Sequence, residues 1–189
     1  DNKIENLEFY KPSDDSDEIK YLKKRRDLLG GPLPKRSFKK VELKTPSIEK
    51  HSNFLFEKSD REYSTTTGLV RSLGNIMRDK DFGKRVVPIV ADEARTFGMA
   101  NLFSQIGIYS PDGQLYEPED ATSILKYQES KTGQLLEEGI NEAGAISSWL
   151  AAATSYSNHN FPMIPFYIFY SMFGFQRIGD LIWAAADQM

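Results

Sequence analysis

The sequence contains no cysteine and only two histidines, His51 and His159, which lie far apart in the chain. The absence of cysteine excludes disulfides, a thiol nucleophile and metal sites built on thiolates, and it is compatible with a reducing compartment such as the cytoplasm. Two separated histidines leave little material for a His-rich metal site or for a Ser-His-Asp triad. We therefore expect no metal ligands in this chain.

Long apolar runs are also missing. The longest candidate, residues 161–169, contains two prolines and is too short to span a bilayer. The first ten residues have neither the basic start nor the apolar core of a signal peptide. The net charge is −3, from 24 basic and 27 acidic residues, which gives no electrostatic reason to bind nucleic acid or an anionic membrane.

The first 50 residues have too little apolar content to build a core. Residues 14–29 have the acidic start, basic last turn and terminal Gly30–Gly31 pair that are typical of a helix. Pro32 and Pro34 then predict an extended connector. The basic run at residues 23–26 is flanked by acidic residues, which favours a solvated helix face over a nucleic-acid patch. We expect an arm over residues 1–50 and one domain over residues 51–189.

The remaining residues alternate between helical and strand patterns. A short helix is expected over residues 47–57, and a second follows Ser64, a favourable N-cap, up to Gly83. Residues 85–91 and 164–170 are β-branched or aromatic runs typical of buried parallel strands. Pro88 interrupts the first run and predicts an edge strand or a kink. A break at residues 171–174 and a helix over residues 176–187 complete an α/β pattern with a mainly parallel sheet.

Residues 134–158 are the most informative stretch. Leu135 and Leu136 suggest a strand, Gly139 a tight turn, and Asn141 the N-cap of an Ala-rich helix. Glu142 then lies in the first helical turn, at the end of a parallel strand where such folds place their chemistry. The alternative is that Glu142 only favours the helix start through the helix dipole.

Two further features lie at strand ends. Asp92 and Glu93 follow the first strand directly, so one can cap or pair with Arg95 while the other faces a cleft. Residues 112–132 form a long polar stretch, and a loop of that length is either mobile or functional. No glycine-rich phosphate loop follows any strand, so neither a dinucleotide fingerprint nor a P-loop is supported.

Five motifs carry a resemblance to a known family. They are DEARTFG (92–98), QIGIYSP (105–111), EGINE (138–142), SWLAAATSY (148–156) and PFYIFYSMFGFQRIGD (165–180). In this order they closely resemble the homodimeric, thiamine-diphosphate-dependent pyruvate dehydrogenase, the decarboxylating component of the bacterial complex. The resemblance is nearly continuous over residues 64–187 and implies an incomplete, transketolase-like, pyrimidine-binding domain.

The resemblance implies roles for six residues. Glu142 matches the glutamate that hydrogen-bonds a ring nitrogen of the aminopyrimidine and so activates the cofactor, which requires a carboxyl in mostly apolar surroundings such as Ile140, Ala143 and Ala145. Phe173 matches the aromatic residue that packs on the pyrimidine ring. The other four match polar positions near cofactor and substrate, namely Tyr170, Arg177, Asp92 and Glu93.

The same resemblance implies that this chain is a fragment. The family's diphosphate and Mg²⁺ ligands lie in an N-terminal domain that the chain lacks, and His51 and His159 match none of its catalytic histidines. The full enzyme would act on pyruvate as a homodimer and would acetylate the lipoyl arm of the acyltransferase core. Two alternatives stay open, namely a non-catalytic α/β assembly module and a related enzyme acting on another 2-oxo acid or a ketose. An unfinished sheet predicts self-association of the fragment.

Overall fold

The computed structural model describes residues 5–6, 9–32, 41–51, 60–91 and 94–188. In the N-terminal arm, α1 (Asp17–Leu28) begins after Ser16, whose Oγ accepts a hydrogen bond from the Ile19 N–H at 3.4 Å. No residue of α1 is buried. A 3₁₀ turn, η1 (Ile48–His51), lies where the first short helix is predicted, and residues 52–57 of that prediction fall outside the described residues.

A three-stranded parallel sheet forms the centre of the domain. Its order is β4 (Leu136–Glu137), β1 (Val86–Val90) and β5 (Ile164–Ile168). A second, two-stranded parallel sheet pairs β2 (Ile108–Tyr109), which precedes the long polar stretch, with β3 (Glu129–Ser130), which lies near its end. The predicted α/β class with a mainly parallel sheet is therefore confirmed.

The strand that contains Pro88 is central, so the prediction of an edge strand is wrong. β1 pairs with β5 along its whole length, and Pro88 lies opposite Phe166. On the other side β4 is paired only with Ile89 and Val90, so the ladder begins just after the proline. A missing N–H is tolerated where no ladder bond is required of it, which explains how a proline enters a central strand.

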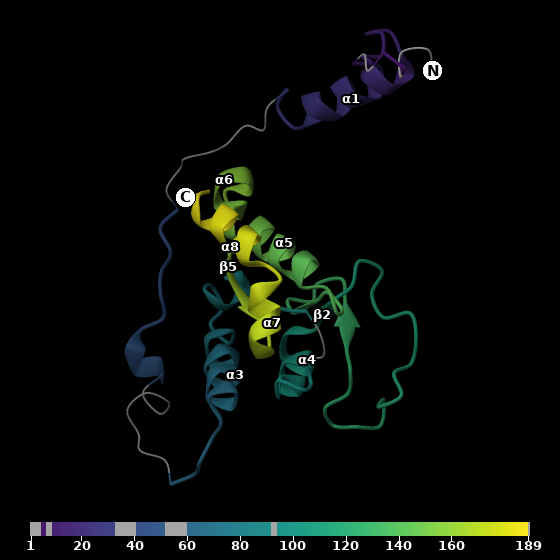
Figure 1. The fold of residues 1–189 in the computed structure, drawn as a ribbon. Coiled ribbons are helices and arrows are strands. Elements are labelled where there is room, and N and C mark those ends of the chain that lie inside the picture. Colours follow the sequence, from purple (N-terminus) through teal and green to yellow (C-terminus); the bar gives the residue numbers. More distant parts are fainter. Residues whose placement is uncertain (1–4, 7–8, 33–40, 52–59, 92–93, 189) are drawn as a thin grey trace.

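Helices cover both faces of this sheet (Figure 1). On one face lie α3 (Thr65–Ile76) and α4 (Ala100–Ile106), with the 3₁₀ turn η2 (Gly83–Arg85) leading into β1. On the other face lies α5 (Glu142–Ala153), followed by the short α6 (Ser155–His159). Figure 1 shows α8 (Gly179–Ala186) running beside α5, after the short α7 (Ser171–Gln176).

The two faces bury different amounts of apolar surface. We name them the α3/α4 face and the α5 face. Side chains of β1 alternate between them, so that Val86 and Val90 join the α3/α4 cluster while Ile89 joins the α5 cluster, as does Ala91 directly after the strand. Among the described residues, the α3/α4 cluster holds 13 buried residues and the α5 cluster holds three. The α3/α4 face is therefore the main core of the domain.

Two predicted helix starts are confirmed. Ser64 Oγ accepts a hydrogen bond from the Thr67 N–H at 3.1 Å, and Asn141 Oδ1 accepts one from the Gly144 N–H at 3.0 Å. Both satisfy a backbone donor that has no partner inside the helix. The helix after Ser64 is shorter than predicted, because α3 ends at Ile76 and turns lead from there to Gly83.

The predicted break at residues 171–174 is wrong, because α7 begins there. Gly174 is buried inside α7, and a Cβ at this position would lie 3.1 Å from the Phe169 side chain. This glycine therefore permits close packing against the strand end and does not interrupt the helix. The break comes later, at Arg177 and Ile178, between α7 and α8.

Within the described part of the chain, none of the helices combines the length and apolarity that crossing a bilayer requires.

Candidate functional site

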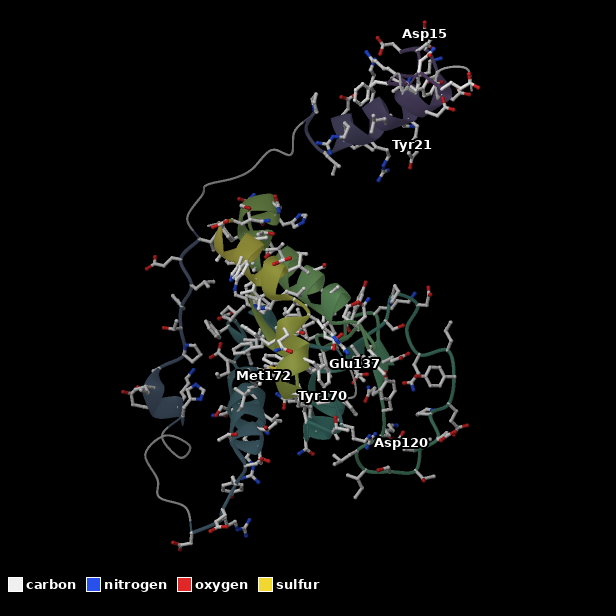
Figure 2. All side chains as sticks on the ribbon, in the orientation of Figure 1. Asp15, Tyr21, Asp120, Glu137, Tyr170 and Met172 are labelled. Carbon is white, nitrogen blue, oxygen red and sulfur yellow. The ribbon has the colours of Figure 1, made fainter. Side chains whose placement is uncertain are left out.

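The carboxyl ends of the three parallel strands meet at one edge of the sheet. Glu137 ends β4, Phe169 and Tyr170 follow β5, and the first turn of α5 starts just beyond Glu138. Figure 2 labels Glu137 and Tyr170 in this central part of the molecule. Parallel α/β sheets bind their ligands at this edge, which makes it the place to look for a site.

Glu142 and Arg177 are brought together here from positions 35 residues apart. Arg177 Nη1 donates to Glu142 Oε1 at 2.7 Å, and the side chains are 11% and 56% exposed for Glu142 and Arg177 respectively. Glu142 is the first residue of α5, so its carboxylate also lies at the positive end of the helix dipole. The pair therefore presents a largely buried carboxylate beside an accessible guanidinium.

Aromatic rings extend this pair into a continuous group. The Arg177 guanidinium lies 4.7 Å from the centroid of the Phe173 ring, within cation–π distance. Phe173 meets Tyr170 edge to face, with centroids 5.5 Å apart, and Tyr170 lies 6.0 Å from the Phe97 ring. The structure thus brings four of the six predicted site residues into one chain of contacts.

The surroundings of Glu142 are less apolar than the sequence suggests. Of the three apolar neighbours predicted around it, only Ala145 is buried, while Ile140 and Ala143 are exposed. The predicted apolar pocket around Glu142 is therefore not formed by these neighbours. The Arg177 cation and the start of α5 both stabilise the negative charge of the carboxylate.

Asp92 and Glu93, the other two predicted site residues, lie outside the described residues.

Tyr167 was missed by sequence reasoning. Its hydroxyl donates to the Gly174 carbonyl at 2.9 Å, and its ring stacks on Phe169 with centroids 5.3 Å apart. Desolvation and the negative charge of Glu142 raise the pKa of Tyr167, so its hydroxyl remains a donor. The alternation along β5 carries the signal for Tyr167, because the residue falls on the same sheet face as α5.

Two more carboxylates at this edge have structural partners. Glu138 accepts a short hydrogen bond from the Ser148 hydroxyl on α5. Glu137 accepts one from the Ala94 N–H at 2.8 Å and one from the Tyr127 hydroxyl at 2.9 Å. Both glutamates connect the end of β4 to neighbouring segments. Local sequence patterns do not predict these connections, because the partners are distant in sequence.

Three cavities lie away from this group. The one between α3 and η1 has a volume of about 450 Å³ and contains His51, whose Nδ1 lies 2.8 Å from Asn75 Nδ2. A second, also about 450 Å³, lies between α5 and the sheet and contains His159. The third, about 250 Å³, lies between α3 and α4. Glu142, Tyr170 and Arg177 line none of these three cavities.

Among the described residues, no group of three or more His, Asp or Glu is placed to hold a metal ion.

Comparison with known proteins gives a consistent result. The family model for the pyruvate dehydrogenase E1 component middle domain matches residues 51–189. The pyruvate dehydrogenase E1 component of Pseudomonas aeruginosa is 58% identical over 187 residues, which are 99% of this chain and 21% of that protein. Those of Escherichia coli K12 and Mycobacterium tuberculosis are 54% and 50% identical, over 100% and 96% of this chain and 21% and 20% of their own lengths.

The chain therefore spans about a fifth of the length of these relatives. The family match covers the whole three-stranded sheet and the four contacting site residues, which we name the Glu142 group: Glu142, Tyr170, Phe173 and Arg177. The chain belongs to the pyruvate dehydrogenase E1 component family, and residues 51–189 correspond to its middle domain.

Proposed function

We propose that the protein containing this chain decarboxylates pyruvate with thiamine diphosphate and passes the acetyl group to a lipoyl arm of an acyltransferase core. The proposal rests on the family of the chain and on the five motifs that resemble the bacterial enzyme. The observation that supports this location of the site is that Arg177 contacts both Glu142 and Phe173 at the carboxyl edge of the sheet.

The described residues fit the aminopyrimidine half of that cofactor. A flat heterocycle with ring nitrogens needs an aromatic surface to pack against and a carboxyl group to hydrogen-bond. Phe173 and Tyr170 offer partly exposed rings, and Glu142 offers a carboxylate at the start of a helix. From the resemblance to the family, we propose that the ligands for Mg²⁺ and the diphosphate come from parts of the protein outside this chain.

Each residue then has a defined task. Thiamine diphosphate, when bound, supplies an acidic thiazolium carbon for attack on the keto group of a 2-oxo acid. Glu142 holds a hydrogen bond to a pyrimidine nitrogen and exchanges a proton there, while Phe173 packs on the ring. Arg177 keeps Glu142 oriented through their 2.7 Å contact, and its exposed guanidinium together with Tyr170 faces the substrate.

The rest of the assignment extends the same proposal. Residues 1–50 form an arm or linker, and residues 51–189 form part of a pyrimidine-binding domain. Asp92 and Glu93 supply further carboxylates to the cofactor cleft. The site around Glu142 is completed by other parts of the enzyme, which works as a homodimer.

The test is the Glu142→Gln substitution in the full-length protein. The amide has nearly the same shape but cannot exchange a proton, so pyruvate turnover should fall by about 100-fold to 10,000-fold, the usual contribution of a general acid–base group. The KM for pyruvate should change little, because the carboxylate acts on the cofactor. Turnover is measured by pyruvate-dependent reduction of an artificial electron acceptor.

Glu129→Gln is the matched control, because Glu129 accepts a hydrogen bond only from the exposed Tyr116 hydroxyl among the contacts described. It should turn over pyruvate like the wild type. Unchanged turnover in Glu142→Gln would remove Glu142 from the mechanism. A wild-type protein with no thiamine-diphosphate-dependent turnover of pyruvate would favour the non-catalytic assembly module, or an enzyme acting on a different 2-oxo acid or a ketose.

A further inference from the structure

Glu137 lies at the junction of three segments. It is the last residue of β4, and in the sheet it is paired with Val90, the last residue of β1. Its two carboxylate oxygens have different partners: Oε1 accepts from the Ala94 N–H at 2.8 Å and Oε2 from the Tyr127 hydroxyl at 2.9 Å. One side chain therefore ties the end of β4 to the turn after β1 and to the polar loop.

Tyr127 is held firmly on the loop side. Its ring meets Phe103 of the α3/α4 cluster edge to face, with centroids 5.6 Å apart. Its backbone N–H donates to both carboxylate oxygens of Asp120, at 3.0 and 3.1 Å, and Asp120 also forms an ion pair with Arg95. Desolvation, together with the charge of Glu137, raises the pKa of Tyr127, so the hydroxyl keeps its proton and donates.

Ala94 is held equally firmly on the other side. The residue is fully buried in the α3/α4 cluster, and its carbonyl accepts from the Met99 N–H at 3.1 Å. Its own N–H has Glu137 as its acceptor, because no backbone carbonyl takes that role among the contacts described. In the sequence, Ala94 follows directly on Asp92 and Glu93.

We infer that Glu137 is a positioning residue, which fixes the backbone directly after Asp92–Glu93 and joins it to the polar loop through Tyr127. It does not touch cofactor or substrate; it acts through the segments that it holds together. This role for Glu137 in catalysis rests on the proposed function, whereas the mechanical tie itself rests only on the contacts of the folded chain.

The loop provides a matched control for this arrangement. Tyr116 and Glu129 form a second tyrosine–glutamate hydrogen bond, 3.2 Å long, in the same polar stretch. That pair is more exposed than Tyr127 and Glu137, and no contact described joins Glu129 Oε1 or Oε2 to the turn after β1. Substitution of Glu129 therefore removes a tyrosine–glutamate hydrogen bond of the same kind, but it leaves intact the contacts by which Glu137 joins the three segments.

The first experiment is hydrogen–deuterium exchange on the full-length protein, with wild type, Glu137→Ala, Glu137→Gln and Glu129→Ala. In Glu137→Ala, peptides covering residues 90–99 and 120–130 should both exchange at least about tenfold faster, because a buried amide loses its acceptor. Glu137→Gln should recover protection at residues 90–99, since the amide oxygen still accepts from Ala94. Unchanged exchange in both peptides of Glu137→Ala would overturn the tie.

The second experiment measures pyruvate turnover of the same variants beside Glu142→Gln. Misplacement of a nearby segment should lower kcat of Glu137→Ala by about 10-fold to 100-fold, with partial recovery in Glu137→Gln and none of the loss in Glu129→Ala. If the wild type turns over pyruvate and Glu142→Gln does not, but Glu137→Ala matches the wild type, then the positioning role is wrong and the proposed function stands. If the wild type has no turnover, the proposed function fails and the exchange experiment alone decides the tie.

Discussion

The two faces of the central sheet differ in how completely they are covered. The α3/α4 face buries large side chains, including Phe103, Leu73 and Met99, between the strands and two helices. Among the described residues, the buried cluster of the α5 face consists of Ile89, Ala91 and Ala145, and the helices α7 and α8 beside it expose Met172, Phe175 and Trp183. Both faces belong to the same three strands.

This difference separates two tasks within one domain. Burial of apolar surface stabilises the fold roughly in proportion to its area, so the α3/α4 face supplies most of the stability. The exposed aromatic side chains on α7 and α8 form the kind of surface that is completed by another protein surface or a ligand. The Glu142 group lies on this incomplete side, next to α7.

The largest loss of stability should come from the removal of a buried side chain on the α3/α4 face. Phe103→Ala removes a fully buried ring from its centre, and such a deletion costs about 3–5 kcal/mol through lost burial and the cavity left behind. The loss is measured as the unfolding free energy from hydrogen exchange of the α4 amides in the full-length protein. Phe103→Leu should keep most of the stability, and a cost below about 1 kcal/mol for Phe103→Ala would contradict the assignment of this face as the core.

A smaller, pH-dependent effect should come from Tyr127, which joins the α3/α4 cluster to Glu137. Burial raises the pKa of Tyr127 above its ordinary value of about 10, so the folded protein keeps this proton when the unfolded chain has lost it. This contribution to stability is complete below pH 10 and declines as the pH rises further. Wild type should therefore lose stability more steeply than Tyr127→Phe between pH 9.5 and pH 11.5.

Thermal unfolding of the full-length protein at intervals of half a pH unit measures this difference. Tyr116→Phe is the comparison variant, because desolvation and the hydrogen bond to Glu129 also raise the pKa of Tyr116, but Tyr116 is exposed whereas Tyr127 is half-buried. Its profile should differ from that of the wild type less than the profile of Tyr127→Phe does. Parallel profiles for wild type and Tyr127→Phe would show that the Tyr127 hydroxyl is not desolvated.

Local sequence patterns predict the starts of the helices on both faces of the sheet, but not how the helices and strands pack against one another. Ser64 and Asn141 cap helices as their sequence positions suggest, because capping depends on the next three residues only. The prediction of an edge strand at Pro88 is wrong, because the place of this residue in the sheet depends on where β4 begins. The local pattern around Gly174 predicts a break, because the close approach of Gly174 to Phe169 is not visible in it.

In the candidate site, too, single residues are predictable from the sequence, whereas their contact partners are not. The sequence predicted Glu142 at a helix start, and family motifs pointed to Tyr170, Phe173 and Arg177. The contact of Glu142 with Arg177 spans 35 residues, and those of Glu137 with Tyr127 and Ala94 span 10 and 43. Such partners follow from the stacking of β4, β1 and β5, which no local periodicity encodes.

The smallest effect on stability should come from the α5 side. Trp183 on α8 is 72% exposed, so Trp183→Ser should change the stability of the domain by less than about 0.5 kcal/mol. If the exposed side chains of α7 and α8 form an interface, the same substitution should weaken self-association of this chain, measured by sedimentation velocity over a range of concentrations. Ile124→Ser is the control, since Ile124 is 95% exposed on the polar loop and lies outside this surface. Equal self-association of Trp183→Ser and Ile124→Ser would show that general hydrophobicity, and not the α5 side, drives the contact between copies.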